Sequence, residues 1–269
     1  MDELTYERVK SFINEQYHMD LNRYKEKQMH RRLSAWLRRS RVSTWTDYFQ
    51  MVRTDPEEEK RFRDYLTINV TAFFRDPERW KSLETEVMPL LLSNLNGSSS
   101  YRSGLKIWSA GCSIGAEPYT LAMLLERISP GKTHDILATD FDRGALDQAR
   151  VGGPYPADII KHISEVDLKK YFRLEGKSYF VKQRLREAIR FAEGDLLSGT
   201  FETDFDLIVC RNVVIYFTRE IKEELYLKFH QSLKGDGVLF LGGTEIIPQS
   251  RKLGFTNIGG SVYKKIPVN

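Results

Sequence analysis

A glycine-containing turn offers the clearest chemistry in this sequence of 269 residues. Gly111 and Gly115 follow a short apolar run at 105–110, which is typical of a buried β-strand. An amphipathic stretch at about 117–128 begins directly after them, with Pro118 in its expected first turn. In a doubly wound sheet this strand-to-helix turn lines the ligand crevice, and glycines such as Gly111 let the backbone approach a bound molecule. The alternative interpretation is a tight connection that binds nothing.

The residues around this turn indicate which small molecule it would bind. No Lys-Ser or Lys-Thr pair follows the glycines and no GxGxxG spacing occurs, so the sequence lacks both a phosphate-binding P-loop and a dinucleotide fingerprint. Instead, Glu117 stands at the start of the next helix, where its charge would repel a phosphate. Asp140 ends the next expected strand, at the place from which an acid reaches a ribose diol. A ligand with a ribose and a positive charge, but without phosphate, fits S-adenosylmethionine.

Length and composition exclude several classes of protein. A chain with 41% hydrophobic and 12% aromatic residues can bury a substantial core, which excludes a disordered chain, a collagen-like repeat and a disulfide-stabilised miniprotein. Cys112 and Cys210 lie far apart without a CxxC pair, so we predict neither a zinc cluster nor a disulfide framework. The sequence shows no signal-peptide pattern and no apolar run long enough for a bilayer. We therefore expect a cytoplasmic protein without direct membrane insertion.

Periodicity predicts how the chain is divided. Apolar residues at helical spacing predict an all-helical N-terminal domain at 1–74. Residues 75–103 are expected to form a linker that contains one helix and a polar segment at 93–100. Within 104–269, short apolar runs alternate with amphipathic stretches, which predicts an α/β fold with a mostly parallel, Rossmann-like sheet. The expected strands are 105–110, 135–140, 189–193, 205–210 and 237–242, and the expected helices are about 117–128, 142–150 and 219–233.

Two departures from this alternation are predicted. About 40 residues separate the helix that ends near Val151 from the strand at Ile189, more than a simple connection requires. Alternating runs around Gly176 predict a hairpin there, so we expect an inserted small β-subdomain at about 154–188. Near the C-terminus, Gly259-Gly260 between two short runs predicts a hairpin that closes the edge of the sheet.

Two further clusters of polar residues accompany the glycine turn. Residues Thr67–Asp76 alternate short polar side chains and then place two aromatic residues beside an arginine; alone, this segment fits a helix N-cap followed by core aromatics. Residues Cys210–Phe217 run off the end of the 205–210 strand, which faces the same crevice. Asp195, after the 189–193 strand, is expected either to meet an adenine amino group or to serve as a turn residue.

The segments Thr67–Asp76, Trp108–Thr120, Ala138–Asp142 and Cys210–Phe217 together resemble the chemotaxis receptor (protein-glutamate) O-methyltransferases, the CheR family. The resemblance covers nearly the whole chain, and its NxTxFFR, GCSxGxEPYT and CRNVxIYF stretches are specific to that family. It implies a Rossmann-like S-adenosylmethionine-dependent methyltransferase that methylates glutamates on chemoreceptor cytoplasmic helices, forms S-adenosylhomocysteine and uses no metal. By the same resemblance, the residues around the cofactor are Asn69, Thr71, Arg75, Glu117, Asp140, Asp195, Leu196, Arg211 and Asn212. Position 195 departs from the family pattern, which has Asn there.

The resemblance places Arg75 and Tyr216 nearest the transferred methyl group, as the catalytic residues. Methyl transfer to a glutamate carboxylate needs no strong general base, because that carboxylate is ionised near neutral pH, with a pKa of about 4.3. The five histidines are scattered along the chain, which is consistent with a reaction without a histidine triad. We therefore expect catalysis by positioning, with Arg75 orienting the carboxylate and Tyr216 shaping the path of the methyl group.

A basic run in the helical domain is the expected partner site. Between Arg23 and Arg41 the sequence has eight Lys or Arg residues and one acid. The predicted helix places four of them on a face away from Met29, Leu33 and Trp36. These four are Arg31, Arg32, Arg38 and Arg39. We expect this face to bind the acidic helical bundle of a chemoreceptor; a solvated surface or a nucleic-acid site are the alternatives.

Two other functions were weighed against receptor methylation. A nucleic-acid methyltransferase would need an [N/D]PP[Y/F] tetrapeptide or a catalytic Pro-Cys pair, and neither occurs, so we expect no nucleic-acid partner. A non-enzymatic sensor of S-adenosylmethionine that binds receptors remains an alternative. The loop around Gly176 is shorter than in relatives that bind a receptor's C-terminal peptide. We therefore expect a peptide-independent enzyme, and a monomer.

Overall fold

The computed structural model describes residues 1–67, 69–97 and 104–267. Contacts divide the chain into two compact units. The first, which we call the helical unit, comprises Met1–Ile68 and Val214–Lys222. The second, the sheet unit, comprises Asn69–Val213 and Glu223–Asn269. Within the described ranges, no helix is long and apolar enough to cross a membrane.

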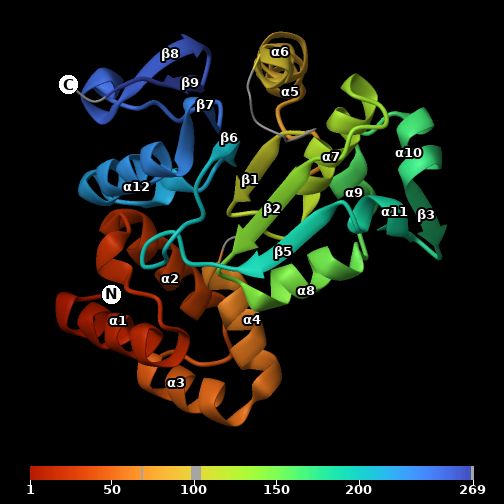
Figure 1. Ribbon diagram of the computed structural model, residues 1–269. Helices are drawn as coiled ribbons and strands as arrows, with labels where there is room; N and C mark the ends of the chain where they lie inside the picture. Colours follow the sequence, from red (N-terminus) through yellow and green to blue (C-terminus); the bar gives the residue numbers. More distant parts are fainter. Residues whose placement is uncertain (68, 98–103, 268–269) are drawn as a thin grey trace. The chain divides into compact units, whose positions relative to one another are not determined.

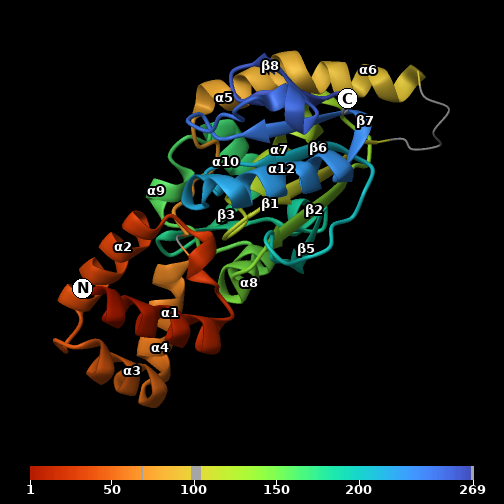
Figure 2. The ribbon, with the colours of Figure 1, turned by 90° about the vertical axis from the view of Figure 1, so that its left-hand side faces the viewer.

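The helical unit is built from the helices drawn in red to orange in Figure 1 and Figure 2. They are α1 (Glu3–Tyr17), the 3-10 helix Leu21–Arg23, α2 (Glu26–Arg39), α3 (Trp45–Thr54) and α4 (Pro56–Leu66). Helix α4 begins with a side-chain N-cap, since the Asp55 carboxylate accepts hydrogen bonds from the first-turn amides of Glu57 and Glu58. The core is aromatic, and the buried rings of Tyr48 and Phe62 lie 5.1 Å apart.

A distant segment of the chain completes the helical unit. Residues Val214–Tyr216 form a 3-10 turn, and the carbonyl of Tyr216 accepts a hydrogen bond of 2.8 Å from the amide of Lys25. The ring of Phe217 lies 5.2 Å from that of Tyr24, edge to face. The end of the CRNVxIYF motif therefore belongs to the helical unit by its contacts, although its beginning belongs to the sheet unit.

The sheet unit contains a seven-stranded sheet in the order β5-β2-β1-β6-β7-β9-β8, seen in Figure 1. Its strands are β1 (Lys106–Ala110), β2 (Asp135–Asp140), β5 (Ile189–Glu193), β6 (Phe205–Cys210), β7 (Leu233–Leu241), β8 (Phe255–Gly259) and β9 (Val262–Lys265). The first five pair in parallel, and the β8–β9 hairpin adds two antiparallel strands at the edge. The predicted Rossmann-like α/β class is confirmed, and so is the closing hairpin.

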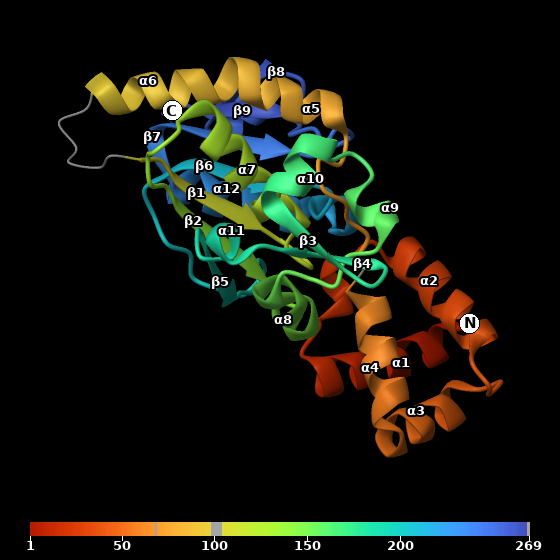
Figure 3. The same ribbon diagram turned by 90° about the vertical axis from the view of Figure 1, so that its right-hand side faces the viewer.

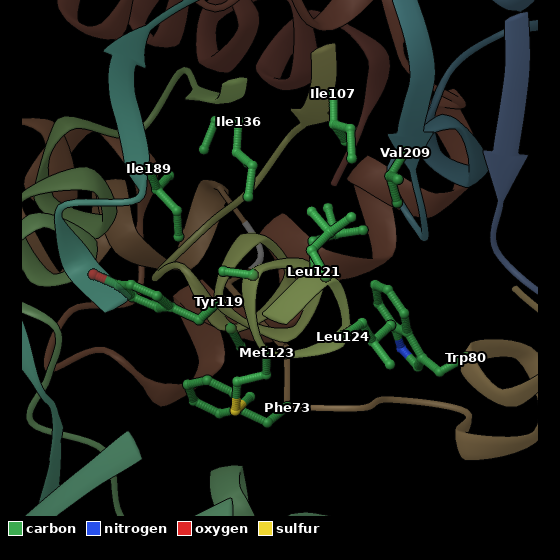
Figure 4. Packing of buried hydrophobic residues seen from close by; sticks show 14 of the residues in the cluster. Phe73, Trp80, Ile107, Tyr119, Leu121, Met123, Leu124, Ile136, Ile189 and Val209 are labelled. Carbon is green, nitrogen blue, oxygen red and sulfur yellow. The ribbon is translucent and has the colours of Figure 1, made fainter. Parts of the chain in front are cut away.

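Helices cover both faces of this sheet, as a parallel sheet requires. They include α5 (Pro77–Ser82), α6 (Met88–Gly97), α7 (Ala116–Ile128), α8 (Arg143–Val151) and α12 (Arg219–Ser232). Figure 4 shows Ile107 and Ile136 pointing from the strands toward Leu121 of α7. Trp108 faces the other way, with its ring 5.5 Å from that of Phe229 in α12.

The predicted polar link at 93–100 is corrected in its first half. Helix α5 continues through a π-helical turn, Leu83–Val87, into α6, which ends only at Gly97. Leu92 and Leu95 pack against the sheet unit's hydrophobic core, and this burial outweighs the polar composition of the segment. Residues 98–100 lie outside the described part of the chain.

The inserted segment is more helical than a small β-subdomain. The predicted hairpin is present as β3 (Phe172–Glu175) and β4 (Ser178–Val181), with Gly176 at a φ of 59° in its turn. Three short helices surround it in the sequence, as Figure 3 shows: α9 (Ala157–Ile160), α10 (Glu165–Tyr171) and α11 (Gln183–Arg186). Their shortness leaves little periodicity to read, and for this reason the sequence revealed only the hairpin.

The expected domain boundary at residue 74 also differs from the structure, in which the sheet unit begins at Asn69. The reason is Phe73, which is fully buried there. Its amide donates a hydrogen bond of 2.9 Å to the carbonyl of Ile159, and its ring lies 5.1 Å from those of Tyr155 and Phe172. The NxTxFFR segment is therefore part of the sheet unit.

This assignment makes a prediction about stability. Phe73→Ala should lower the free energy of unfolding of the sheet unit by about 3–5 kcal/mol, because it removes a buried ring and leaves a cavity. Val70, in the same segment, is 73% exposed, and Val70→Ala should change stability by less than about 0.5 kcal/mol. Chemical denaturation of both variants measures the difference. Similar small effects would mean that the segment is only a connection.

Candidate cofactor and docking sites

In the turn after β1, the backbone conformation and the close packing at two positions favour glycine over any other residue. Gly111 and Gly115 have φ values of 84° and 91°, in the left-handed region. A Cβ at Gly111 would lie 2.6 Å from the side chain of Val213. The amides of Gly111 and Cys112 both donate to the carbonyl of Thr139 at 2.9 Å. The turn therefore packs against the loop that follows β6 and against the last residues of β2.

Asp140 connects the loops that follow β1 and β2. Its Oδ2 accepts a hydrogen bond of 2.7 Å from the amide of Ser113, and its Oδ1 accepts one of 2.9 Å from the amide of Asp142. Burial raises the pKa of this carboxyl, while the two backbone donors oppose the shift. Asp140 thus stands at the predicted place at the end of β2, and it also organises the backbone around it.

Asn69 brings the NxTxFFR segment to the same edge of the sheet. Its Oδ1 accepts a hydrogen bond of 2.8 Å from the hydroxyl of Ser113, and its Nδ2 donates one of 2.6 Å to the carboxylate of Asp142. Asn69, Gly111 and Asp140, expected at one site from separate parts of the sequence, therefore lie together in the structure. Ser113 and Asp142, which connect them, were not among the predicted residues.

Glu117 is a half-buried acid in the first turn of α7. The hydroxyl of Ser109 donates a hydrogen bond of 2.8 Å to its Oε1. Burial raises its pKa to about 7; the charges of Arg211 and Arg75 oppose this shift and that of Glu245 adds to it. Within the described ranges, no basic group forms an ion pair with Glu117. A cationic ligand would stabilise its charged form, so these residues fit S-adenosylmethionine.

Arg211, at the end of β6, is buried and already engaged by the protein. Its Nη1 donates to the carbonyl of Arg75 at 2.9 Å, and its Nη2 forms an ion pair with Asp76 at 2.8 Å. Its guanidinium lies 5.2 Å from the ring centres of both Trp80 and Phe240. Arg211 therefore holds residues 75 and 76 against the sheet. Its positive charge also lowers the pKa of Glu117.

Arg75 lines a cleft of about 630 Å³ on the sheet unit. One wall of this cleft is the 69–77 segment, which includes Asn69 and Thr71, and the other is the segment that contains Lys161 and His162. The Nη1 of Arg75 donates a hydrogen bond of 2.8 Å to the carbonyl of Val70. This bond holds the guanidinium along the cleft wall.

The remaining predicted site residues have different surroundings. Asp195 makes the hydrogen bonds of a turn residue, accepting from the amide of Leu197 at 2.8 Å and the hydroxyl of Ser198 at 2.5 Å. Leu196 beside it is buried. Tyr216 belongs to the helical unit, so its proximity to Arg75 stays a prediction.

Sequence reasoning missed Glu245, a buried acid in the loop after β7. Its Oε2 accepts hydrogen bonds from the amides of Asn212, at 3.0 Å, and Gly242, at 2.5 Å. Its position in the sequence could have indicated it. Glu245 comes shortly after the end of a parallel strand, as Asn212 does, and Asp140 is the last residue of another; residues at the carboxyl ends of parallel strands lie at one edge of the sheet.

Two family models cover almost the whole chain. The model for the all-alpha domain of CheR methyltransferases matches residues 4–67, and the model for their S-adenosylmethionine-binding domain matches residues 69–264. The chain belongs to the CheR methyltransferase family. It is thus an S-adenosylmethionine-dependent methyltransferase, as the resemblance predicted. The division between the two family models coincides with the start of the sheet unit at Asn69.

Curated relatives agree with this assignment over nearly their full length. A chemotaxis protein methyltransferase of Listeria monocytogenes is 40% identical, and the match covers 92% of each chain. One of Borreliella burgdorferi is 32% identical and matches 98% of this chain and 94% of its own. The chemotaxis protein methyltransferase Cher2 of Pseudomonas putida is 29% identical over 91% and 90% of the two chains.

The basic face of α2 is smaller than predicted. Arg31, Arg38 and Arg39 are exposed. Arg32 is half-buried instead: its guanidinium donates to the carbonyl of Tyr65 and lies 4.5 Å from the centre of that ring. The reason is helical spacing, since position 32 lies three residues after the buried Met29 and so shares its side of the helix.

The shifted pKa of Glu117 predicts that cofactor binding depends on pH. Because that pKa is about 7, part of the free protein carries a proton on Glu117 at neutral pH. A cationic ligand favours the carboxylate, so affinity for S-adenosylmethionine should rise from about pH 6 to about pH 8, with proton release near neutral pH. Calorimetry in buffers of different ionisation enthalpy measures both quantities.

Glu117→Gln should remove this pH dependence and weaken binding about tenfold or more at pH 8, because the amide carries no charge. Asp135, at the opposite end of β2 from Asp140, provides the control. Asp135→Asn should leave both affinity and proton release unchanged. An unaltered pH dependence in the Glu117 variant would show that another group titrates.

Proposed function

We propose that this protein transfers the methyl group of S-adenosylmethionine to glutamate side chains of chemoreceptor cytoplasmic helices, forming glutamate methyl esters in chemotaxis adaptation. One observation carries the proposal: Glu117, Asp140 and Asn69 converge around the glycine turn. They do so in a chain whose curated relatives are named chemotaxis protein methyltransferases.

We assign three positions to cofactor binding. The carboxylate of Glu117 complements the positive charge of S-adenosylmethionine, and Asp140, at the end of β2, accepts from the ribose hydroxyls. The side-chain amide of Asn69 holds the NxTxFFR segment at the same edge of the sheet through its hydrogen bonds to Ser113 and Asp142. When bound, the cofactor supplies a methyl group made electrophilic by the sulfonium. No metal is needed for its transfer, because donor and acceptor already carry opposite charges.

Arg75 is the residue that we assign to the acceptor. An exposed glutamate is already ionised near neutral pH, so the protein has to orient it rather than deprotonate it. The Arg75 guanidinium lines the cleft, and its bond to the carbonyl of Val70 uses only one of its nitrogens among the described residues. The others can form charge-assisted hydrogen bonds to a carboxylate. Tyr216 is proposed to shape the path of the methyl group.

Methylation of cytosine at its ring carbon 5 is disfavoured by the cysteines. That reaction requires a cysteine nucleophile, which has to be accessible and ionised. Cys112 and Cys210 are both buried, and burial raises the pKa of each thiol well above its usual value. Neither residue is therefore a nucleophile at neutral pH.

Labelled S-adenosylmethionine tests the proposed function directly. The purified protein is incubated with membranes rich in chemoreceptors, or with DNA, and the label is followed. Base-labile label on the receptors is expected, because glutamate methyl esters hydrolyse in alkali. Label on DNA, or cofactor binding without any transfer, would contradict the proposal.

A variant of Arg75 tests the positioning mechanism. Arg75→Ala should lower turnover about 100-fold or more, because the acceptor carboxylate is no longer oriented, while affinity for S-adenosylhomocysteine stays within about threefold. Arg75→Lys keeps the charge without the planar donors and should have intermediate turnover. Steady-state kinetics and calorimetry provide the two measurements. Equal losses in turnover and affinity would refute a positioning role.

Receptor binding through α2 predicts sensitivity to salt. We propose that the exposed Arg31, Arg38 and Arg39 face an acidic receptor bundle, so kcat/KM should fall as salt rises, since surface charges are screened over about 8–10 Å. Arg38→Glu/Arg39→Glu should lower kcat/KM about tenfold at low salt and flatten the salt dependence. Arg53→Glu/Lys60→Glu changes the net charge equally, at exposed residues outside α2, and should have little effect. Equal effects of the two double variants would indicate a response to overall charge only.

A further inference from the structure

A buried carboxylate joins two loops at the carboxyl edge of the sheet. Strands β6 and β7 are parallel neighbours, with Cys210 paired to Leu241 at their ends. Glu245, in the loop after β7, is 3% exposed. One oxygen of its carboxylate accepts hydrogen bonds from two backbone amides, that of Gly242 after β7 and that of Asn212 after β6. The two loops are therefore connected through a single side-chain atom.

The conformation of Asn212 shows why such a connection is needed. Its φ is 62°, in the left-handed region that few residues other than glycine adopt and that asparagine tolerates better than most. Its amide is held there by the 3.0 Å hydrogen bond to Glu245. The Oδ1 of Asn212 is buried and has no hydrogen-bond partner in the described part of the protein. A buried amide oxygen without a partner is costly unless a ligand supplies the donor.

The absence of a side chain at Gly242 leaves the space that the carboxylate oxygen of Glu245 occupies. A Cβ at Gly242 would lie 2.5 Å from the Oε2 of Glu245 and 2.9 Å from the amide nitrogen of Asn212. The amide of Glu245 also donates back to the carbonyl of Gly242 at 2.9 Å, which closes the turn. Glycine leaves the space that the oxygen fills. The neighbouring Gly243 is different, because its Cβ would meet only Arg79 at an ordinary 3.5 Å.

We propose that Glu245 is a positioning residue, which holds Asn212 in its left-handed conformation and thereby aims the Asn212 amide at the cofactor. The inference rests on the proposed role of Asn212 in binding S-adenosylmethionine. It assigns Glu245 no contact with the cofactor and no chemical step. At about pH 8, where Glu117 is mostly ionised, its effect on binding passes through the backbone of Asn212.

The charge of Glu245 has a second, measurable consequence. The charges that shift the pKa of Glu117 most are those of Arg211 and Arg75, which lower it, and that of Glu245, which raises it. Removing the charge of Glu245 removes a repulsion that favours the protonated form of Glu117. The pH below which cofactor affinity declines should therefore shift downward, which separates the effect of this charge from that of the hydrogen bonds to the loops.

Affinity for S-adenosylhomocysteine, measured by calorimetry, tests the inference. Glu245→Ala should weaken binding about tenfold, because the Asn212 amide loses its acceptor. Glu245→Gln keeps an oxygen that can accept both hydrogen bonds, so at about pH 8 its affinity should stay within about threefold. The same Gln variant should show the downward shift in the pH dependence of S-adenosylmethionine binding.

Gly242→Ala and Gly243→Ala form a matched pair. The first displaces the Glu245 oxygen by steric overlap and should weaken binding about as much as Glu245→Ala. The second adds the same methyl group one residue later and should bind like the unaltered protein. This pair keeps the inference testable if Glu245→Ala fails to fold.

A double-variant cycle with Asn212 gives the decisive comparison. If Glu245 acts through Asn212, then at about pH 8, where Glu117 is mostly ionised, Glu245→Ala should weaken binding no further in an Asn212→Ala background. Additive losses would overturn the inference, and so would full affinity in a folded Glu245→Ala variant. Failure of the unaltered protein to bind S-adenosylhomocysteine would instead count against the proposed cofactor site, so the two failures are distinguishable.

Discussion

The carboxyl edge of the sheet, where we propose that the cofactor binds, depends on two carboxylates that accept hydrogen bonds from backbone amides. Asp140 holds the amides of Ser113 and Asp142, and Glu245 holds those of Gly242 and Asn212. In a parallel sheet, the loops after neighbouring strands begin with amides that no strand can satisfy, and leaving such groups buried and unpaired is costly. A carboxylate with two acceptor oxygens satisfies a pair of them. The acids therefore shape the loops before any ligand is present.

The same burial creates the electrostatic character of the site. Glu117 and Asp140 both have raised pKa values because burial disfavours their charged forms. Among the basic groups, Arg211 lowers the pKa of Glu117 most. Its guanidinium is already hydrogen-bonded to Asp76 and to the carbonyl of Arg75. Negative charge is therefore incompletely balanced around the glycine turn. A cationic nucleoside restores that balance, whereas a phosphate would worsen it, which links the fold to the proposed choice of cofactor.

Much of the sheet was predictable because its parallel strands are short segments rich in apolar residues with clear ends. The predicted strands at 135–140, 189–193 and 205–210 agree with β2, β5 and β6 residue for residue. Predictions were wrong where packing overrides local composition: α6 extends through polar residues because Leu92 and Leu95 are buried, and Arg32 turns inward onto Tyr65. Helical spacing from Met29 indicates the inward side of α2 for Arg32, but its partner Tyr65 is distant in the sequence, and so are the core residues that bury Leu92 and Leu95.

For the candidate site, the sequence indicated which segments lie at the carboxyl edge of the sheet, but not which partner each side chain contacts. The rule that parallel strands end at one edge predicted that the loops after β1, β2 and β6 meet, as they do where Gly111 approaches Val213 and the amide of Ser113 donates to Asp140. It does not distinguish side chains that meet a ligand from those that hold a loop. Arg211 illustrates the limit, because its motif position is compatible with either role and only its bonds to the 75–76 backbone reveal the second. A family motif therefore combines two kinds of residue. Those that hold the loops give the others their geometry, and so a change far from the reacting atoms can alter binding as much as a change beside them.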